Sequence, residues 1–278
     1  MAVLEDDVAT SSDSSCELED FQRILTDKKN DCKALGIEEP LFICAPMVRY
    51  SKLHFRKLVH LYGCDLAYTP MIYAHCFVAS QKCRENEFTT DENDWPIVQF
   101  AANKPEHFAE AAELVYGNVK GIDLNCGCPK SDFEAAGVSH IGVHGRTVSQ
   151  RAEPPDYEAI GLVKSAVKVP VYANGGCTSY RQALEIASVT KCDGVMVGEG
   201  LLSNPALFCG HQKTPFECIR DWFSIATDLD VHYTLVHRHT AFMTHSLFNK
   251  TQRMDLQKQT TISDTINFVN EQLPLFDC

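Results

Sequence analysis

The feature that most constrains the fold is an alternation of short apolar segments with helix-like segments between residues 41 and 197. Apolar runs closed by proline, glycine or a polar residue predict strands, and the capped amphipathic stretches between them predict helices. Such alternation gives a parallel sheet, because each parallel strand is reached through a crossover helix. Strands are predicted over 42–46, 66–69, 97–100, 122–125, 140–144, 169–174 and 194–197. Helices are predicted over 51–62 (capped by Ser51 and stopped by Gly63), over 105–116, over 157–167 and after Ser179.

Polar or glycine residues stand at the carboxyl end of most predicted strands. They are Gln99, Asn125, His144, Asn174-Gly175-Gly176 and Gly198-Glu199-Gly200. Clustering at that end is typical of the active face of a TIM (β/α) barrel. A doubly wound sheet would more often show one glycine-rich phosphate loop after its first strand, and the sequence has none there.

The strand count falls one short of a complete barrel. Seven barrel-type strands are predicted, and the segment 130–139 between two of them has room for one short helix only. The expected fold class is therefore α/β, a TIM (β/α) barrel lacking about one βα unit. Closing such a barrel should disturb its tilt and shear, so we expect an open or strained barrel.

Three regions follow from composition and periodicity. Residues 1–40 form an acidic tail and lead-in whose first 20 residues hold no lysine or arginine, so we expect disorder there. Residues 41–213 form the barrel. Residues 214–278 lack strand alternation and read as a small helical C-terminal domain, with apolar faces that include Trp222, Phe223 and Met243.

Composition limits the class of protein. The chain has 278 residues, 45% of them hydrophobic and 22% charged, as in soluble globular proteins, and no apolar run long enough to span a membrane. Its 13 cysteines follow no disulfide frame, so we expect a reducing, cytoplasmic location, with a nuclear one as a further option. The net charge of −12 opposes a nucleic-acid partner, but the acidic tail carries much of it.

Candidate chemistry lies at the strand ends. Cys128, between Gly127 and Pro129 after the strand 122–125, is placed like a reactive thiol, although most buried cysteines are inert packing residues. A flavin mononucleotide would need backbone N–H groups for its phosphate, which the glycines after the last two strands could supply. Gln99, the turn at Ala45-Pro46-Met47 and His144 could serve its ring; each alone could equally be an ordinary turn or a solvated side chain.

Four C-terminal histidines invite a metal interpretation. They are His232, His237, His239 and His245. Their spacing matches no familiar zinc pattern, so we expect surface histidines on helices and no metal.

Several motifs together resemble those of the tRNA-dihydrouridine synthases. They are Cys44-Ala45-Pro46-Met47-Val48-Arg49-Tyr50-Ser51-Lys52, Val98-Gln99-Phe100, Asp123-Leu124-Asn125-Cys126-Gly127-Cys128-Pro129, Val143-His144-Gly145-Arg146-Thr147, Ala173-Asn174-Gly175 and Asn204-Pro205-Ala206. The resemblance spans residues 40–278. It is greatest to the eukaryotic class that modifies uridines 20a and 20b of the tRNA D-loop.

The resemblance implies a chemistry and a set of roles. NADPH or NADH would reduce bound FMN, and a hydride would pass to C6 of an extruded uracil while Cys128 protonates C5. The helical domain would bind tRNA. Asn125 and Arg146 would bind substrate. Residues implied to bind FMN are Pro46, Met47, Val48, Gln99, His144, Asn174, Gly175, Gly176, Gly198 and Glu199.

The sequence departs from the family in two places. Between Cys128 and His144 it lacks a stretch that would hold a helix and a strand ending in a Lys-x-Arg motif, so no lysine matches the family's flavin lysine. Glu199 stands where several members have arginine, and Asn174-Gly175-Gly176 lacks an acidic third residue. We therefore expect a splice-derived or truncated form with impaired flavin affinity. A non-catalytic tRNA-binding or unstable protein, and a small-molecule flavin oxidoreductase, are the alternatives.

Overall fold

The computed structural model describes residues 23, 26–126, 138–147, 149–150 and 153–272. The chain divides into two compact units, Met1–Glu39 and Pro40–Cys278. In the first unit, residues 26–35 of the lead-in form a helix. The acidic residues 1–20, for which we predicted disorder, lie outside the described residues.

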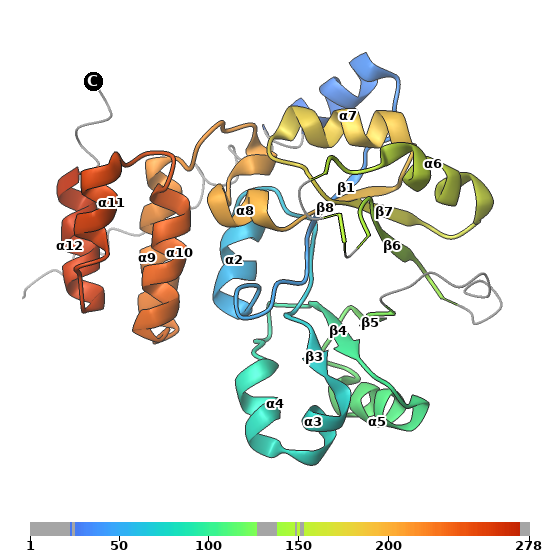
Figure 1. The fold of residues 1–278 in the computed structure, drawn as a ribbon, viewed down its shortest axis with the longest axis horizontal. Helices are drawn as coiled ribbons and strands as arrows, with labels where there is room; N and C mark the ends of the chain where they lie inside the picture. The colour runs from blue at the N-terminus through green and yellow to red at the C-terminus, as the bar shows by residue number, and fades with distance from the viewer. Residues whose placement is uncertain (1–22, 24–25, 127–137, 148, 151–152, 273–278) are drawn as a thin grey trace, which may run out of the picture. The chain divides into compact units, whose positions relative to one another are not determined.

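The second unit is built on parallel strands (Figure 1). The strands are β1 (Leu41–Cys44), β2 (Leu66–Ala67), β3 (Ile72–Tyr73), β4 (Ile97–Ala101), β5 (Gly121–Leu124), β6 (Ile141–His144), β7 (Val171–Asn174) and β8 (Gly194–Val197). They pair in the orders β2-β1-β8-β7-β6 and β3-β4-β5, and every ladder is parallel. One parallel bridge, Tyr68 to Ile97, joins the two sheets.

The short strand β3 was not predicted. We expected one strand over 66–69, whereas in the structure β2 ends at Ala67 and a further strand, β3, begins at Ile72, after Pro70, which has no N–H to donate to a ladder. Thr69 still donates its N–H to the Ile97 carbonyl at 2.9 Å. Counting β2 and β3 as one interrupted strand gives the seven barrel strands that the sequence predicts.

The strand order has two ends, β5 and β6. Among the described residues, no ladder joins them. Both strands are also more exposed than β4, β7 and β8, and Leu124 of β5 is 40% exposed. Parallel strands are normally buried on both faces, so the exposure of β5 and β6 is unusual, and within the described part of the chain each of them pairs with one strand only. The missing unit predicted from the short segment 130–139 falls at this gap.

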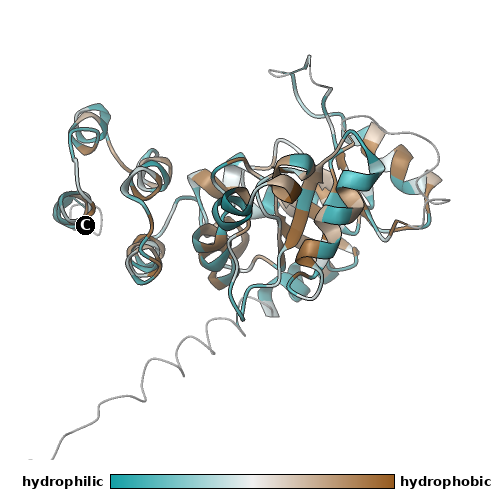
Figure 2. Cartoon of the chain, turned by 90° about the horizontal axis from the view of Figure 1, so that it is seen from below, coloured by the Kyte–Doolittle hydropathy of each residue, from teal (hydrophilic) through white to brown (hydrophobic). Residues whose placement is uncertain are grey.

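Helices cover the strands. They are α2 (Leu53–Leu61), α3 (Ala74–Ala79), α4 (Gln81–Glu87), α5 (Pro105–Val115), α6 (Tyr157–Ala166), α7 (Tyr180–Thr190), α8 (Glu199–Ser203) and a 3-10 turn, Leu207–Cys209. In Figure 2 the central strands are largely brown, while the helices carry both apolar and polar colours, as expected for elements buried on one side. The helices α3 and α4 were not predicted.

Of the two predicted helix caps, one is confirmed. Ser179 accepts a hydrogen bond from the Gln182 N–H and caps α7. The prediction for Ser51 was wrong, because α2 begins after Lys52 without a side-chain cap. The Ser51 hydroxyl instead accepts from the Met47 N–H at 2.9 Å, so a local turn competes with the helix for it.

The C-terminal region is helical, as predicted. It contains α9 (Phe216–Asp228), α10 (Tyr233–Thr244), α11 (Lys250–Leu256) and α12 (Ile262–Gln272). Its apolar core, centred on the fully buried Trp222, includes Leu58 of α2 and Ala206, so barrel and helical segments share one cluster. The proposed boundary at residues 213 and 214 stays a prediction. No described helix is both long and apolar enough to cross a lipid bilayer.

The prediction of surface histidines was wrong for His239. Its side chain is fully buried in α10, stacked on Phe55 and close to Trp222, and neither ring nitrogen has a hydrogen-bond partner. The ring of His54 lies 5.7 Å away. Across the described part of the chain, no group of three or more metal-binding side chains occurs.

These two histidines should make stability depend on pH. Burial, with the charges of Lys52 and Arg56, lowers the pKa of His54 from 6.5 to about 4, and burial beside His54 lowers that of His239 to about 3. Since the unfolded chain then binds protons first, this stability is complete above pH 6.5 and is lost as the pH falls toward 3. At pH 5 each histidine should cost about 2 kcal/mol of unfolding free energy.

Urea unfolding at pH 7.5 and pH 5.0 tests this expectation. His239→Leu should remove about half of the acid-side loss of stability. The matched control, His211→Leu, changes an exposed histidine and should leave the loss as it is. An unchanged pH dependence in His239→Leu would contradict the assignment.

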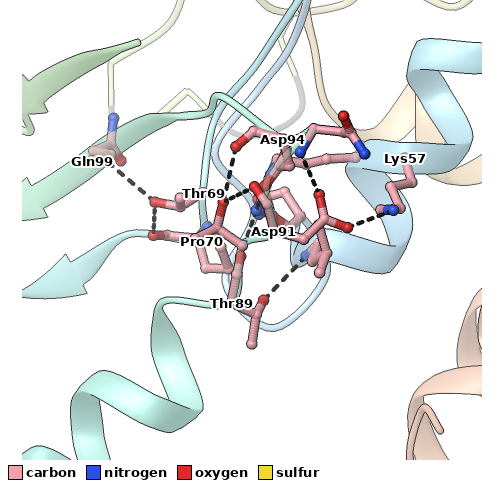
Figure 3. A network of polar contacts seen from close by, with 12 residues as sticks. Lys57, Thr69, Pro70, Thr89, Asp91, Asp94 and Gln99 are labelled. Atoms are coloured by element: carbon pink, nitrogen blue, oxygen red, sulfur yellow. Dashed lines mark hydrogen bonds and ion pairs between the residues drawn. The ribbon is translucent and has the colours of Figure 1, made fainter. Parts of the chain in front are cut away.

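A buried arginine of α2, Arg56, binds the segment before β4, and Figure 3 labels Thr89, Asp91 and Asp94 of that segment. Arg56 is fully buried and contacts the Asp94 carboxylate through Nε at 3.2 Å and Nη2 at 2.5 Å. It also donates to the carbonyls of Ser51 and Thr89, at 2.7 and 2.6 Å. One guanidinium therefore fixes three backbone segments.

Removing this cation should be costly. Arg56→Met leaves the Asp94 carboxylate buried without its partner and should lower the unfolding free energy by about 3–5 kcal/mol. Lys57→Met, which breaks the half-exposed pair with Asp91, should cost about 1 kcal/mol or less. Chemical denaturation at neutral pH measures both, and equal costs would show that the buried pair contributes no more than the surface pair.

Candidate functional site

The ends of β4 and β5 carry three interlocked polar side chains. Gln99 is paired in register with Asp123, and its Nε2 donates to Asp123 Oδ2 at 2.7 Å. Asn125 Nδ2 lies 3.4 Å from Gln99 Oε1. The Gln99 N–H also donates to Thr69 Oγ1 at 3.2 Å (Figure 3). Gln99 is therefore buried and fixed, not a solvated strand-end residue.

His144, at the end of β6, is held in one tautomer. Its Nδ1 accepts a hydrogen bond from the Arg146 N–H at 3.1 Å, which leaves the proton of the neutral ring on Nε2. Burial, together with the charge of Arg146, lowers the pKa of His144 below 6.5. The ring is therefore neutral at pH 7 and presents Nε2–H as a donor. The Arg146 guanidinium itself donates to the Glu153 carbonyl at 2.5 Å.

The turn after β7 requires glycine at two successive positions. Gly175 and Gly176 have φ of 117° and 74°, and a Cβ on Gly175 would lie 3.1 Å from His144 Cε1. A Cβ on Gly176 would lie 2.6 Å from Pro155 Cγ. Tyr157 donates its hydroxyl proton to the Gly175 carbonyl at 3.0 Å. The turn is thus tightly packed, and the His144 ring lies directly on its backbone.

The ends of β1 and β8 meet in the same way. A Cβ on Gly198 would be 3.5 Å from Met47 Sδ and 3.6 Å from Ala45 Cβ, so Ala45 and Met47 lie against Gly198. Val48 is 57% exposed. Glu199 opens α8 and is also exposed. Asn174 Nδ2 lies 3.4 Å from Met196 Sδ on β8.

The predicted site residues thus form three groups. The first is Gln99 and Asn125; the second is His144, Arg146, Asn174, Gly175 and Gly176; the third is Pro46, Met47, Val48, Gly198 and Glu199. Contacts among the described residues connect Gln99 with Asn125, His144 with Arg146 and Gly175, and Met47 with Gly198, but none runs directly from Gln99 to His144. Cys128, the predicted general acid, lies outside the described residues.

A polar cluster that the sequence did not reveal lies between the first two groups. Tyr68 Oη is 2.8 Å from His140 Nε2, Asp123 Oδ1 is 3.9 Å from the same nitrogen, and the His140 ring stacks on Tyr172 at 4.9 Å. Burial lowers the pKa of His140, against an opposing effect of Asp123, so the ring is neutral at pH 7. The cluster connects β5 with the start of β6 across the gap in the strand order. In the sequence, the one sign of this cluster is the alternation of side chains along each strand, which places Asp123 and Tyr68 on the same face of the sheet.

Chemically, these groups offer a neutral imidazole donor, fixed amides and glycine turns at strand ends. Glycine turns with free backbone N–H groups accommodate phosphate, and fixed amides and imidazole N–H groups recognise a planar heterocycle. The arrangement defines a ligand site at the carboxyl face of a parallel (β/α) sheet.

The class of protein is given by comparison with known families. The dihydrouridine synthase family matches residues 43–134 and 131–270, and the chain belongs to this family. An uncharacterized tRNA-dihydrouridine synthase-like protein of Caenorhabditis elegans is 40% identical over 262 residues, covering 74% of this chain and 92% of that protein.

Two further relatives carry more specific names. A Homo sapiens protein named tRNA-dihydrouridine(20a/20b) synthase (NAD(P)+)-like is 37% identical over an alignment of 299 residues including gaps. The alignment covers 88% of this chain and 94% of the human protein. The tRNA-dihydrouridine(20a/20b) synthase (NAD(P)+) of Schizosaccharomyces pombe is 33% identical over an alignment of 281 residues including gaps, which covers 81% of this chain and 86% of the yeast protein.

The comparisons also bear on the unit that the sequence predicts to be missing. The alignment with the human relative is longer than the 278 residues of the chain itself, so the relative holds residues for which this chain has no counterpart. The two family segments meet at residues 131–134. This position falls between β5 and β6, where the strand order is open.

The contact between His144 and the glycine turn can be tested directly. Gly175→Ala forces a Cβ toward His144 at a φ of 117°, so it should both destabilise the fold by about 1–2 kcal/mol and displace the imidazole. Gly117→Ala introduces the same type of strain, at a φ of 87°, with nothing within 4 Å of the new Cβ. Both variants should lose stability, but only Gly175→Ala should shift the His144 ring signals in NMR spectra. Unchanged signals would show that the ring does not rest on this turn.

Proposed function

We propose that this chain carries the scaffold of an FMN-dependent tRNA-dihydrouridine synthase. The reaction is reduction of the C5=C6 bond of a D-loop uridine in tRNA, with NADPH or NADH as reductant. The observation that carries the proposal is the set of family motif residues held at one sheet face, with His144 fixed as a neutral donor on the turn at Gly175.

The described residues fit one side of an FMN site. Gly175 and Gly176 adopt positive φ in a packed turn where a side chain would clash, which is the geometry needed for close backbone approach of a phosphate or ring. Gln99 supplies a buried amide whose second N–H is not used by Asp123. The opposite side would come from the region between β5 and β6, where the chain has no residue matching the family's flavin lysine.

Each side chain has a distinct task in this proposal. His144 donates from Nε2 to an oxygen or nitrogen of the bound heterocycle. Asn125, exposed at the end of β5, binds the uracil, and Arg146 the adjoining nucleotide. The Cys128 thiol gives its proton to C5, since a thiol pKa lies close enough to neutrality for proton transfer. The chemistry that bound FMN supplies is hydride transfer to C6.

The macromolecular partner is tRNA. The target base must leave its stack to reach a flavin at the sheet face, and uridines 20a and 20b are the proposed targets. The helices α9 to α12 would bind the RNA through phosphates and shape. A cytoplasmic or additionally nuclear location accords with the free thiols of the described cysteines.

The open strand order favours a second candidate function. A chain that lacks the unit between β5 and β6 would bind FMN weakly, and it would then act as a non-catalytic tRNA-binding protein. Reoxidation of bound flavin by tRNA separates the synthase from a small-molecule flavin oxidoreductase, and tRNA binding without bound flavin identifies the non-catalytic candidate.

The absence of the unit between β5 and β6 should lower the amount of FMN that the chain binds. We expect the purified chain to show far less than one FMN per molecule by visible absorbance, even after FMN is added. Insertion of the corresponding segment of the human relative between Lys130 and Ser131 should raise occupancy to near one. Full occupancy without the insertion would show that the site is complete as it stands.

The protein that carries the inserted segment also allows a test of the reaction. Unmodified tRNA should reoxidise its reduced flavin under anaerobic conditions, and Cys128→Ala should slow this step by about 10²–10⁴-fold, the usual contribution of a general acid. Cys126→Ala, which removes the exposed neighbouring thiol, is the matched control and should retain the rate. No reoxidation by tRNA in the flavin-loaded protein would refute the proposed substrate.

A further inference from the structure

One exposed arginine adopts a backbone conformation that favours glycine. Arg49 has φ of 74°, and the other non-glycine residues with positive φ in the described chain are Lys191 and Asp230. Lys191 is the C-cap of α7, and Asp230 follows the C-cap of α9, positions where this conformation is ordinary. Arg49 lies instead between β1 and α2, so no helix end accounts for its conformation.

The surrounding turn holds this conformation without help from the arginine side chain. Met47 donates its N–H to Ser51 Oγ at 2.9 Å, and the Met47 carbonyl accepts from the N–H groups of Tyr50 and Ser51 at 3.0 and 3.1 Å. Ser51 is fully buried, and its carbonyl accepts from Arg56. Glycine would suit position 49 better, so the arginine side chain contributes nothing that the turn needs.

The turn lies between the strand-end site and the helical region. Met47 packs against Gly198 at the end of β8. The ring of Tyr50, on the other side of Arg49, packs edge-on against His239 and Phe242 of α10, at 5.6 and 5.2 Å between centroids. A strand of RNA that reaches from α10 to the sheet face would therefore pass Arg49.

The charge of Arg49 is available for a ligand. No carboxylate pairs with it among the described residues, whereas the neighbouring Lys52 donates to the Asn86 carbonyl at 2.5 Å. Because the chain has a net charge of −12, an unpaired cation beside the strand-end site contributes much of the local attraction for a polyanion. A guanidinium binds phosphate oxygens in pairs, more specifically than an ammonium group.

We propose that Arg49 binds a backbone phosphate of the RNA substrate and so sets how the nucleic acid enters the site. This inference rests on the proposed function. The same chemistry would serve the phosphate of FMN, but Met47 rather than Arg49 contacts the Gly198 turn, and Arg49 is exposed.

The experiment compares stability and tRNA affinity in variants of the full chain. Arg49→Gly should unfold at the same or a higher temperature, because the strain is relieved, while its Kd for unmodified tRNA rises about tenfold. The slope of log Kd against log salt should fall by about 0.7–1, the value for one lost phosphate contact. Arg49→Gln, which keeps the strain, should lose the same affinity without gaining stability.

Lys191→Gly is the matched control. It also removes one exposed positive charge and places glycine at a positive φ, of 56°, but it lies after α7, at the opposite end of the strands from the site. Its tRNA affinity should equal that of the unaltered chain.

Each remaining outcome has a definite meaning. If the unaltered chain binds tRNA and Arg49→Gly binds it equally well, the inference fails and the proposed function stands. If Arg49→Gly lowers the FMN occupancy of the protein that carries the inserted segment but leaves its tRNA binding normal, the phosphate belongs to the cofactor and the RNA assignment is overturned. If the unaltered chain does not bind tRNA at all, the proposed function fails and this inference fails with it.

Discussion

Edge-to-edge hydrogen bonding between parallel strands is the constraint on which this structure depends. Each strand of a closed barrel satisfies its backbone groups on both sides, and here the order β5-β4-β3, β2-β1-β8-β7-β6 leaves one side of β5 and of β6 without a described partner. The polar cluster of Tyr68, Asp123 and His140 lies at this point. Among the described residues, Asp123 of β5 comes within 3.9 Å of His140, which directly precedes β6, so this cluster brings side chains from the two sides of the gap together.

A second dependence is on the buried guanidinium of Arg56. It holds the Ser51 carbonyl in the turn that carries Met47 and Arg49, and it holds Thr89 and Asp94 in the segment that leads to β4 and Gln99. The third and first groups of site residues are therefore positioned by one side chain that touches neither. Exchange of this cation for an apolar group should alter the site as well as the stability of the fold.

The sequence predicted what depends on local pattern. Apolar runs, their polar ends and the short segment 130–139 are local features, and the parallel strands, the site face and the gap followed from them. Predictions from local sequence were wrong where a residue distant in the fold determines the environment of a side chain. The hydroxyl of Ser51 binds Met47 rather than capping a helix, and His239 is buried by Phe55 and Trp222, which lie far away in sequence. His140 could not have been assigned to Asp123 and Tyr68, because that contact depends on how β5 and β6 are brought together.

The open strand order also affects how the site can bind a ligand. Gln99 and Asn125 lie on one side of the gap, and His144 with its glycine turn lies on the other. Among the described residues, no ladder joins the two sheets: the bridge from Tyr68 to Ile97, the hydrogen bonds of Thr69, the contacts of Arg56 and the His140 cluster connect them. On the β5–β6 side of the site, the spacing can therefore change without the loss of a full ladder. A ligand that contacts both sides must then supply from its own binding energy the order that a complete barrel has in advance. This cost lowers affinity for any such ligand, whereas RNA phosphates contacted from the turn at Arg49 alone do not incur it.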